Sequence, residues 1–215
     1  MTRPMFVVAT ALLMLGGCVA PMSTNPLVPP EEAKLPTELM GKYEWQDSNE
    51  VVQQFEFHQP TIPCPHGVFA ITGMPSAPSD EAKTLLVFSE RLGDHHMVHV
   101  PVKRSAKVPG ELEMQEGADR WEPDRIAGYM LVRLRLQDGE LSLSSLDHQL
   151  LAEAIEAGEI QGEVERKVAR NAQRISKLRL TASPADLRAF LLARQATPLF
   201  ARVEFTAKKL PKPTP

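Results

Sequence analysis

The sequence lacks the motifs that usually reveal an enzyme. It contains no nucleophile elbow, zinc-protease helix motif, paired C-x-x-C, phosphate-binding loop or dinucleotide fingerprint. It has only two cysteines, Cys18 and Cys64, and a formal net charge of −3. That small charge argues against general binding of nucleic acid. We therefore predict no catalytic site and no cofactor, and turn to the one long apolar run.

That apolar run lies at the amino end and is short. Met5 to Leu15 forms an eleven-residue apolar stretch after a short segment that contains Arg3. A bilayer-spanning helix needs about 20 apolar residues, so this run is too short to be a stable membrane anchor. Its length is typical of the apolar core of a signal peptide.

The residues that end this run, Leu15-Gly16-Gly17-Cys18, resemble the lipobox of bacterial lipoproteins. The resemblance implies a signal peptide over residues 1–17 and a mature protein that begins at Cys18. It also implies a thioether-linked diacylglycerol and an N-acyl chain on that cysteine, which together anchor the protein in a membrane. A cut by an ordinary signal peptidase is the weaker alternative, because Pro21 would follow it. With Cys18 acylated, Cys64 has no partner for an intrachain disulfide.

The same resemblance bears on localisation. Val19, rather than an aspartate, follows the cysteine, and this favours the outer membrane over retention in the inner membrane. We expect the domain to face the periplasm, with display on the cell surface as an open alternative. The predicted partners are the membrane itself and an envelope protein or an anionic lipid or polymer.

Composition divides the remainder of the chain. Residues 18–36 contain five prolines and no apolar period, so we predict a lipidated cysteine followed by an extended spacer. Residues 37–208 are predicted to form a single globular domain, and residues 209–215 a disordered tail.

Alternating apolar patterns predict a mainly antiparallel β domain. Strands are expected in 50–58, 67–72, 84–90 and 96–103, and a hairpin over 129–146 turns at Asp138-Gly139. Two helices are expected late in the chain, at 147–158 and at 183–195 with Ser183 as N-cap. The predicted fold class is α+β, a curved sheet or partly closed barrel with two helices in the C-terminal half.

Two family resemblances support this reading. The segment from Tyr129 to Arg194 is similar to a group of uncharacterised proteobacterial lipoproteins that share a hairpin, a short helix, a glycine-containing strand and an LTAS-type helix cap. Separately, Gly41-Lys42-Tyr43 resembles the Gly-x-Trp start of lipocalins, with tyrosine in place of tryptophan. The first resemblance implies no site residues, and the second implies a ligand-binding barrel.

Five of the six histidines lie between residues 58 and 99, which raises metal binding as a lesser alternative. His95, Met97 and His99 are predicted to share one face of a strand, and copper or zinc would suit such ligands. However, His95 and His99 would lie about 13 Å apart in a strand. A solvated polar strand face is the simpler interpretation. The candidate ligands are His95, His96, His99, Cys64 and His66.

Other candidate residues are weaker. His66 could lower the pKa of the Cys64 thiol, and Asp94, His95 and His96 are the least poor catalytic candidates.

Residues 140–165 carry seven acidic residues and no Lys or Arg, whereas 166–215 carry twelve basic and two acidic residues. The basic surface candidates are Arg166, Lys167, Arg170, Arg174, Lys177 and Arg179. They could bind a polyanion, or simply offset the acidic helix before them.

These observations leave two main functions. The first is a lipid-anchored envelope protein that acts as an interaction or scaffold module, marked by an exposed apolar or basic patch around residues 160–180. The alternative is a lipocalin-like protein that binds a lipid or another small apolar ligand inside a barrel.

Overall fold

The computed structural model describes residues 21–46, 50–73, 84–104, 112–114, 120–169, 172–195, 197–200 and 203–211. Within them, one branched sheet contains twelve strands, and two α-helices and two 3₁₀-helices accompany it. The strands are β1 (Met22–Ser23), β2 (Gly41–Gln46), β3 (Val52–His58), β4 (Val68–Gly73), β5 (Thr84–Leu92), β6 (His95–Arg104), β7 (Leu112–Met114), β8 (Ile126–Gln137), β9 (Glu140–Ser145), β10 (Gly162–Ala169), β11 (Ala172–Leu180) and β12 (Val203–Lys209). The helices are η1 (Pro123–Arg125), α2 (His148–Glu156), α3 (Pro184–Ala193) and η2 (Pro198–Phe200).

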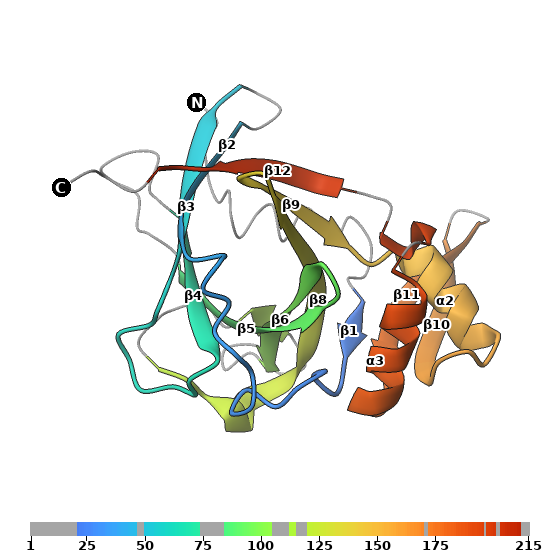
Figure 1. The fold of residues 1–215 in the computed structure, drawn as a ribbon. Helices are drawn as coiled ribbons and strands as arrows, with labels where there is room; N and C mark the ends of the chain where they lie inside the picture. The colour runs from blue at the N-terminus through green and yellow to red at the C-terminus, as the bar shows by residue number, and fades with distance from the viewer. Residues whose placement is uncertain are drawn as a thin grey trace, which may run out of the picture.

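Eight of these strands close into an antiparallel barrel (Figure 1). The order around the barrel is β8-β9-β12-β2-β3-β4-β5-β6, and a ladder between β6 and β8 completes the ring. The predicted α+β fold with a barrel-like sheet and two late helices is thereby confirmed. The sequence predicted a curved sheet or a partly closed barrel. The structure has a closed barrel, because β8 pairs with β6 from Ile126 to Leu134.

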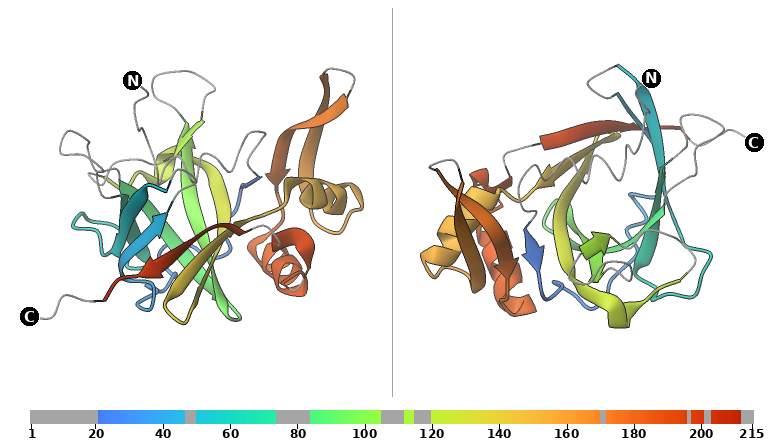
Figure 2. Two further views of the ribbon diagram at one scale, coloured as in Figure 1. Left: turned by 90° about the horizontal axis from the view of Figure 1, so that it is seen from above. Right: turned by 180° about the vertical axis from the view of Figure 1, so that it is seen from behind.

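A lateral module of α2, β10, β11, α3 and η2 lies beside the barrel (Figures 1 and 2). It occupies the stretch of chain between β9 and β12, which are neighbours in the barrel. Its core packs on the outer face of the barrel, where Leu92, Met97 and Leu131 join one apolar cluster with Leu151 and Leu187 of the helices. The short strand β1 lies between the two parts, antiparallel to β8 and parallel to β11.

Local sequence explains the elements that were predicted most directly. Asp138 and Gly139 adopt φ angles of 51° and 80°, which a two-residue hairpin turn requires. Asp147 caps α2 by accepting hydrogen bonds from the N–H groups of the second and third residues after it, both at 2.9 Å. Ser183 caps α3 and Pro184 occupies its first turn. Both helices and the hairpin lie where the sequence predicted them.

The prediction of a spacer over residues 18–36 is wrong for the part that the structure describes. Ser23 is fully buried in β1, Leu27 is 3% exposed in the core of the lateral module, and Ala33 is buried against the barrel wall. This segment shows no apolar period because its apolar side chains pack at separate places. Leu27 packs in the lateral module and Ala33 packs against the barrel wall. Cys18 and residues 1–17 lie outside the described residues, as do 212–215 of the predicted tail. Lys209, which was assigned to that tail, ends β12.

We expect Leu27→Ala to lower the free energy of unfolding by about 2–5 kcal/mol, because it opens a cavity in a packed core. A free spacer would give no change. Urea denaturation measures the difference. Val52→Ala, at a side chain that is 53% exposed, is the matched control and should stay within about 0.5 kcal/mol of the parent.

Candidate functional site

The interior of the barrel is the first candidate site, and its wall is apolar. Inward-facing side chains of all eight strands form one cluster that includes stacked Tyr43 and Phe55 rings, 5.4 Å apart. At its centre lies a cavity of about 30 Å³. The residues that line it are Trp45, Phe55, Phe57, Ile71, Val98, Val100, Val132, Leu134, Leu141, Leu143 and Phe205.

One end of the barrel is closed by the segment that leads into β2. Leu39 is fully buried in the barrel cluster, and Leu35 and Met40 pack against it. Tyr43 donates its hydroxyl hydrogen to the carbonyl oxygen of Leu39 at 2.9 Å. Burial raises the pKa of Tyr43, so the phenol keeps the proton that this bond needs. This end is therefore a fixed floor.

The wall is weakest between β2 and β12. Their ladder has only two residue pairs, Lys208 with Glu44 and Lys209 with Tyr43, whereas β2 and β3 form six. Beyond these pairs the gap is covered by the rings of Trp45 and Phe205, whose centroids lie 4.9 Å apart. We call this part of the wall the slit.

A groove of about 290 Å³ lies outside the slit. It is bordered by Glu44, Trp45, Gln46, Val52, Glu140, Thr206, Ala207 and Lys208. Trp45 lines both this groove and the inner cavity, so it lies between the two. Its Nε1–H is buried and has no hydrogen-bond partner among the described residues. An indole held in place without a hydrogen bond is easier to displace than one that makes its usual bond.

The cavity is small because aromatic rings fill the barrel. An eight-stranded barrel is just wide enough either to be filled by side chains or to hold one small ligand. Here a volume of about 30 Å³ could hold no more than a water molecule or two, and its apolar lining favours a dry cavity. Trp45 and Phe205 are both half-buried, so displacing their rings from the slit would enlarge this space.

The histidine-rich strand does not form a metal site in the described part of the chain. His95, Met97 and His99 do share one face of β6, as predicted, while His96 faces the other side. The expectation that this face is solvated is wrong, because His95, His96 and His99 are all buried. Among the described residues, no three His, Cys, Asp or Glu side chains lie close enough to hold a metal ion.

The other candidates are also dispersed. Cys64 is half-buried in an apolar cluster, and burial raises its pKa, the opposite of an activated thiol. His66 is exposed. Asp94 pairs with His95 at 3.2 Å and with Arg135 at 2.8 Å, but His96 lies on the opposite face of β6 and cannot join them.

His99 is the most unusual of these residues. It is fully buried, its ring stacks on Phe88 at 4.8 Å, and the Tyr129 ring meets it edge-on at 6.1 Å. Neither ring nitrogen has a hydrogen-bond partner among the described residues. Burial lowers the pKa of His99 to about 3, so the imidazole is neutral in the folded protein.

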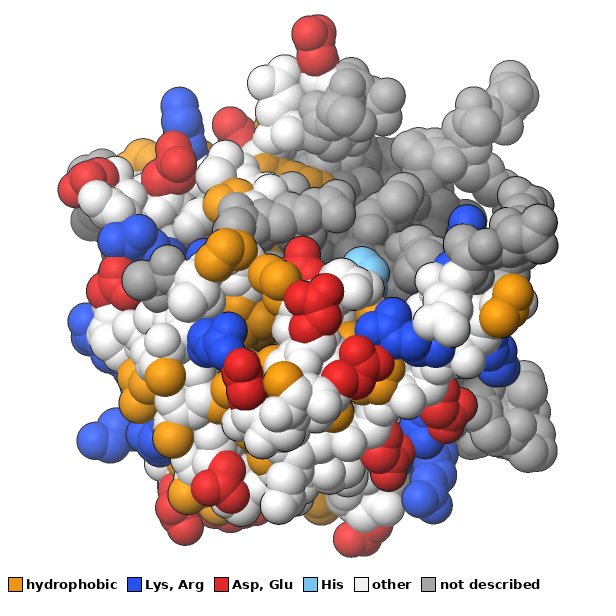
Figure 3. All heavy atoms as spheres, turned by 90° about the vertical axis from the view of Figure 1, so that its right-hand side faces the viewer, with side chains coloured by type: hydrophobic (Ala, Val, Ile, Leu, Met, Phe, Trp, Pro, Cys, Tyr) orange, Lys and Arg blue, Asp and Glu red, His pale blue; other side chains and the backbone are white. Residues whose placement is uncertain are grey.

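The basic surface candidates lie on the β10–β11 hairpin, apart from Arg170, which is outside the described residues. Arg166 pairs with Glu156 of α2 at 2.8 Å, and Lys177 pairs with Glu163 and Glu165 at 2.8 and 3.1 Å. The basic and acidic segments of the sequence therefore offset each other locally. Figure 3 shows this side of the molecule, where cationic and anionic side chains are interspersed.

Sequence reasoning missed the residues that matter most here. Trp45 lies two positions after the Gly41-Lys42-Tyr43 start, and no motif marks it or Phe205. Their contact joins the first and last strands of the barrel, 160 positions apart in the chain. Local periodicity contains no information on such a pairing.

The fully buried His99 predicts a specific dependence of stability on pH. Its pKa is about 3 when folded and about 6.5 when unfolded, so between these values only the unfolded chain binds the proton. Stability must therefore fall as the pH is lowered through this range. The His99 contribution to the loss is roughly 2 kcal/mol between pH 7.5 and pH 5.

We expect His99→Phe to remove that part of the pH dependence, because phenylalanine keeps the stack on Phe88 and cannot be protonated. Urea unfolding at the two pH values measures it. His148→Phe, at an exposed position, should leave the parent's dependence unchanged. Equal losses in the parent and in His99→Phe would contradict the assignment.

In the described part of the chain, no helix is long and apolar enough to span a membrane. Comparison with protein-family models, with curated proteins and with solved structures gave no match. The functional argument therefore depends on the chain's own residues and their geometry.

Proposed function

We propose that this chain is a lipid-anchored envelope protein whose barrel binds a small apolar ligand, such as one acyl chain. The observation that carries the proposal is the combination of an apolar cavity with a slit at which, among the described residues, the rings of Trp45 and Phe205 meet. The two residue pairs between β2 and β12 make this the shortest ladder in the barrel, so it is the place where the wall opens at the lowest cost.

The ligand class follows from the lining. No charged side chain lines the cavity, and burial of a charge there would be strongly unfavourable without a partner. A hydrocarbon chain would instead replace the ring of Trp45 or Phe205 with contacts of the same kind. The groove outside the slit offers Lys208 and two glutamates, Glu44 and Glu140, to a polar head that remains outside.

The interaction-module hypothesis has less support. Its expected mark was a contiguous patch around residues 160–180, and the β10–β11 hairpin does project from the body (Figure 2). Among the described residues of that range, however, Val168 is the only exposed large apolar side chain, at 75%. Arg166 and Lys177 of this hairpin are held in ion pairs with glutamates. We therefore rank ligand binding above a scaffold role.

The anchor belongs to the same proposal. Cys18 lies four positions before β1, which is clamped between β8 and β11. Acylation at Cys18 would hold the barrel close to the membrane surface, since the chain from Met22 onward packs on the domain instead of spacing it away. This is consistent with a protein that exchanges an acyl chain with a bilayer.

Metabolic labelling with palmitate tests the anchor. We expect label in the parent and in Cys64→Ala, and complete loss in Cys18→Ala, because only the lipobox cysteine is acylated. The Cys64 variant is the matched control, since it removes the other thiol. Label that persists in Cys18→Ala would contradict lipidation at this residue.

Ligand binding is tested with a chain that starts at Val19, which keeps every described contact. Native mass spectrometry should detect a stoichiometric bound apolar molecule, or a fluorescent fatty acid should bind saturably at one site. Phe205→Ala should raise the association rate constant of that probe about tenfold, because it opens the slit. Val203→Ala, on the same strand but 50% exposed, should not change it. A clean unbound mass with no saturable binding would refute the proposal.

A further inference from the structure

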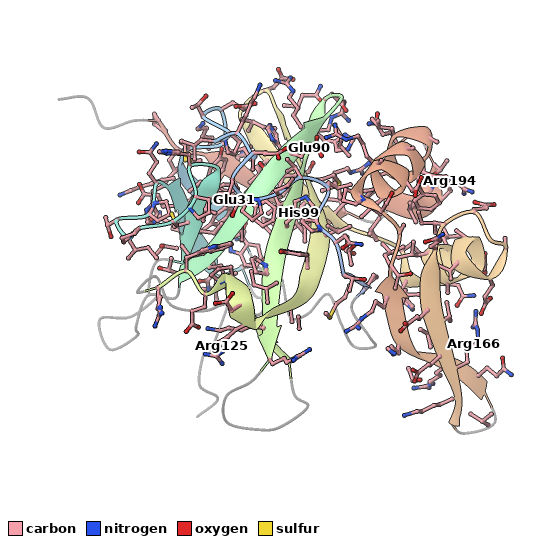
Figure 4. All side chains as sticks on the ribbon, turned by 90° about the horizontal axis from the view of Figure 1, so that it is seen from below. Glu31, Glu90, His99, Arg125, Arg166 and Arg194 are labelled. Carbon is pink, nitrogen blue, oxygen red and sulfur yellow. The ribbon has the colours of Figure 1, made fainter. Side chains whose placement is uncertain are left out.

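The β10–β11 hairpin extends beyond the rest of the lateral module. Figure 2 shows it projecting from the body, and in Figure 4 it continues past Arg166 and away from the helices. Strand β10 is at the edge of the sheet, since its ladder within the described chain is with β11. Residues 167–169 and 172–174 form the far end of this ladder. We call them the hairpin tip.

The pairing of charges changes along this hairpin. Nearer the body, Glu165 lies opposite Lys177, and the two form an ion pair of 3.1 Å. At the tip, Lys167 lies directly opposite Arg174. Both of these side chains are exposed, and neither has an ion-pair partner among the described residues. Like charges directly opposite each other on neighbouring strands are destabilising, so this end of the hairpin favours a bound anion.

An exposed apolar side chain lies beside the two cations. Val168 is 75% exposed, the largest exposed fraction among the large apolar side chains of the described chain. Val164, four positions earlier, packs against the core of the lateral module. Successive residues of a strand alternate between its faces, so both valines lie on one face of β10 and Lys167 on the other. The apolar face of β10 thus continues past the core and ends in solvent at the hairpin tip.

The direction of β1 brings the proposed lipid anchor to the same side of the molecule. Strand β1 pairs in parallel with β11, and Met22 lies beside Arg179. The amino end of β1 therefore points along β11 from Arg179 towards Arg174, which is towards the hairpin tip. Five residues of strand cover this stretch, about 17 Å. Cys18 is four positions before Met22, so its reach is at most about 14 Å. An acyl chain at Cys18 would hold a bilayer near the tip.

We propose that the hairpin tip docks on the surface of an anionic phospholipid bilayer. Lipid phosphates would lie against Lys167 and Arg174 and offset their mutual repulsion. Val168 would enter the boundary between the headgroups and the acyl chains. The tip has few contacts to offer, but an anchored protein meets the bilayer at a high effective concentration, so few are needed. The proposal uses the Cys18 anchor of the proposed function and does not require the barrel to bind a ligand.

The test attaches the chain to the bilayer chemically, so that its outcome does not depend on acylation in the cell. A chain that starts at Cys18 and carries Cys64→Ala is coupled through Cys18 to a maleimide-bearing phospholipid in vesicles. Phosphatidylcholine vesicles with about 30% phosphatidylglycerol are compared with vesicles of phosphatidylcholine alone. Hydrogen–deuterium exchange of residues 166–175 should be at least about threefold slower on the anionic vesicles. The difference should disappear in about 0.5 M salt.

Two double variants separate docking from folding. Lys167→Gln with Arg174→Gln should abolish the difference between the vesicles, because each cation contributes roughly a fivefold factor to binding at an anionic surface. Its Tm should be unchanged or higher, since a like-charge pair is removed. Lys34→Gln with Lys42→Gln is the matched control, which removes the same charge from exposed positions in and before β2. It should exchange like the parent.

Three outcomes would overturn the proposal. The first is equal exchange on the two kinds of vesicle, and the second is a difference that persists after Lys167 and Arg174 are both replaced. The third is protection of the tip by soluble polyphosphate with none from anionic vesicles, which would identify a polyanionic polymer as the partner. The palmitate experiment tests the anchor separately, so its failure and a failure of docking can be told apart.

Discussion

The ladder between β6 and β8 is the interaction on which the rest of the structure depends. It spans His96 to Lys103 on one strand and Leu134 to Ile126 on the other, and it converts an open meander into a ring. The other edge of β8 is shared, with β9 along its second half and β1 near Met130. Because β1 also pairs with β11, β1 holds the lateral module against the barrel. Without this ladder the barrel interior would not be enclosed.

Both faces of β6 are buried, the inner face by closure of the barrel and the outer face by the elements that cover the wall. Val98 and Val100 face the interior, whereas His95, Met97 and His99 face the elements that cover the wall. A strand covered on both sides is expected to be apolar throughout, and three histidines are an exception to that rule. His96 is matched by Glu38 and His95 by Asp94, but His99 stacks on Phe88 and has no polar partner in the described chain. Neutral imidazole is the form that such an environment accepts.

The two cavities differ in chemistry because different parts of the chain enclose them. Strand side chains enclose the barrel interior, and their alternation places one apolar set inside. A second cavity, of about 390 Å³, lies between the edge of β5 beyond its ladder with β4 and an irregular segment that contributes Glu32, Lys34 and Glu38. Polar groups that the barrel keeps outside are therefore available there. The N-terminal segment contributes to both sites, since Leu39 closes the barrel floor while Glu38 pairs with His96.

The sequence by itself determined the local elements: the Asp138-Gly139 hairpin, the capped helices α2 and α3, and the alternation of most strands. These features depend on residues within a few positions of one another, so their pattern is visible in the chain. Closure through β6 and β8, the slit at Trp45 and Phe205, and the burial of the proline-rich segment were decided only by the tertiary structure. The first two bring together residues that are far apart in sequence. In the third, side chains that the local pattern leaves exposed to solvent are covered by distant parts of the chain. For the same reason the histidine strand was misjudged as solvated, since its polar residues are covered by segments from elsewhere in the fold.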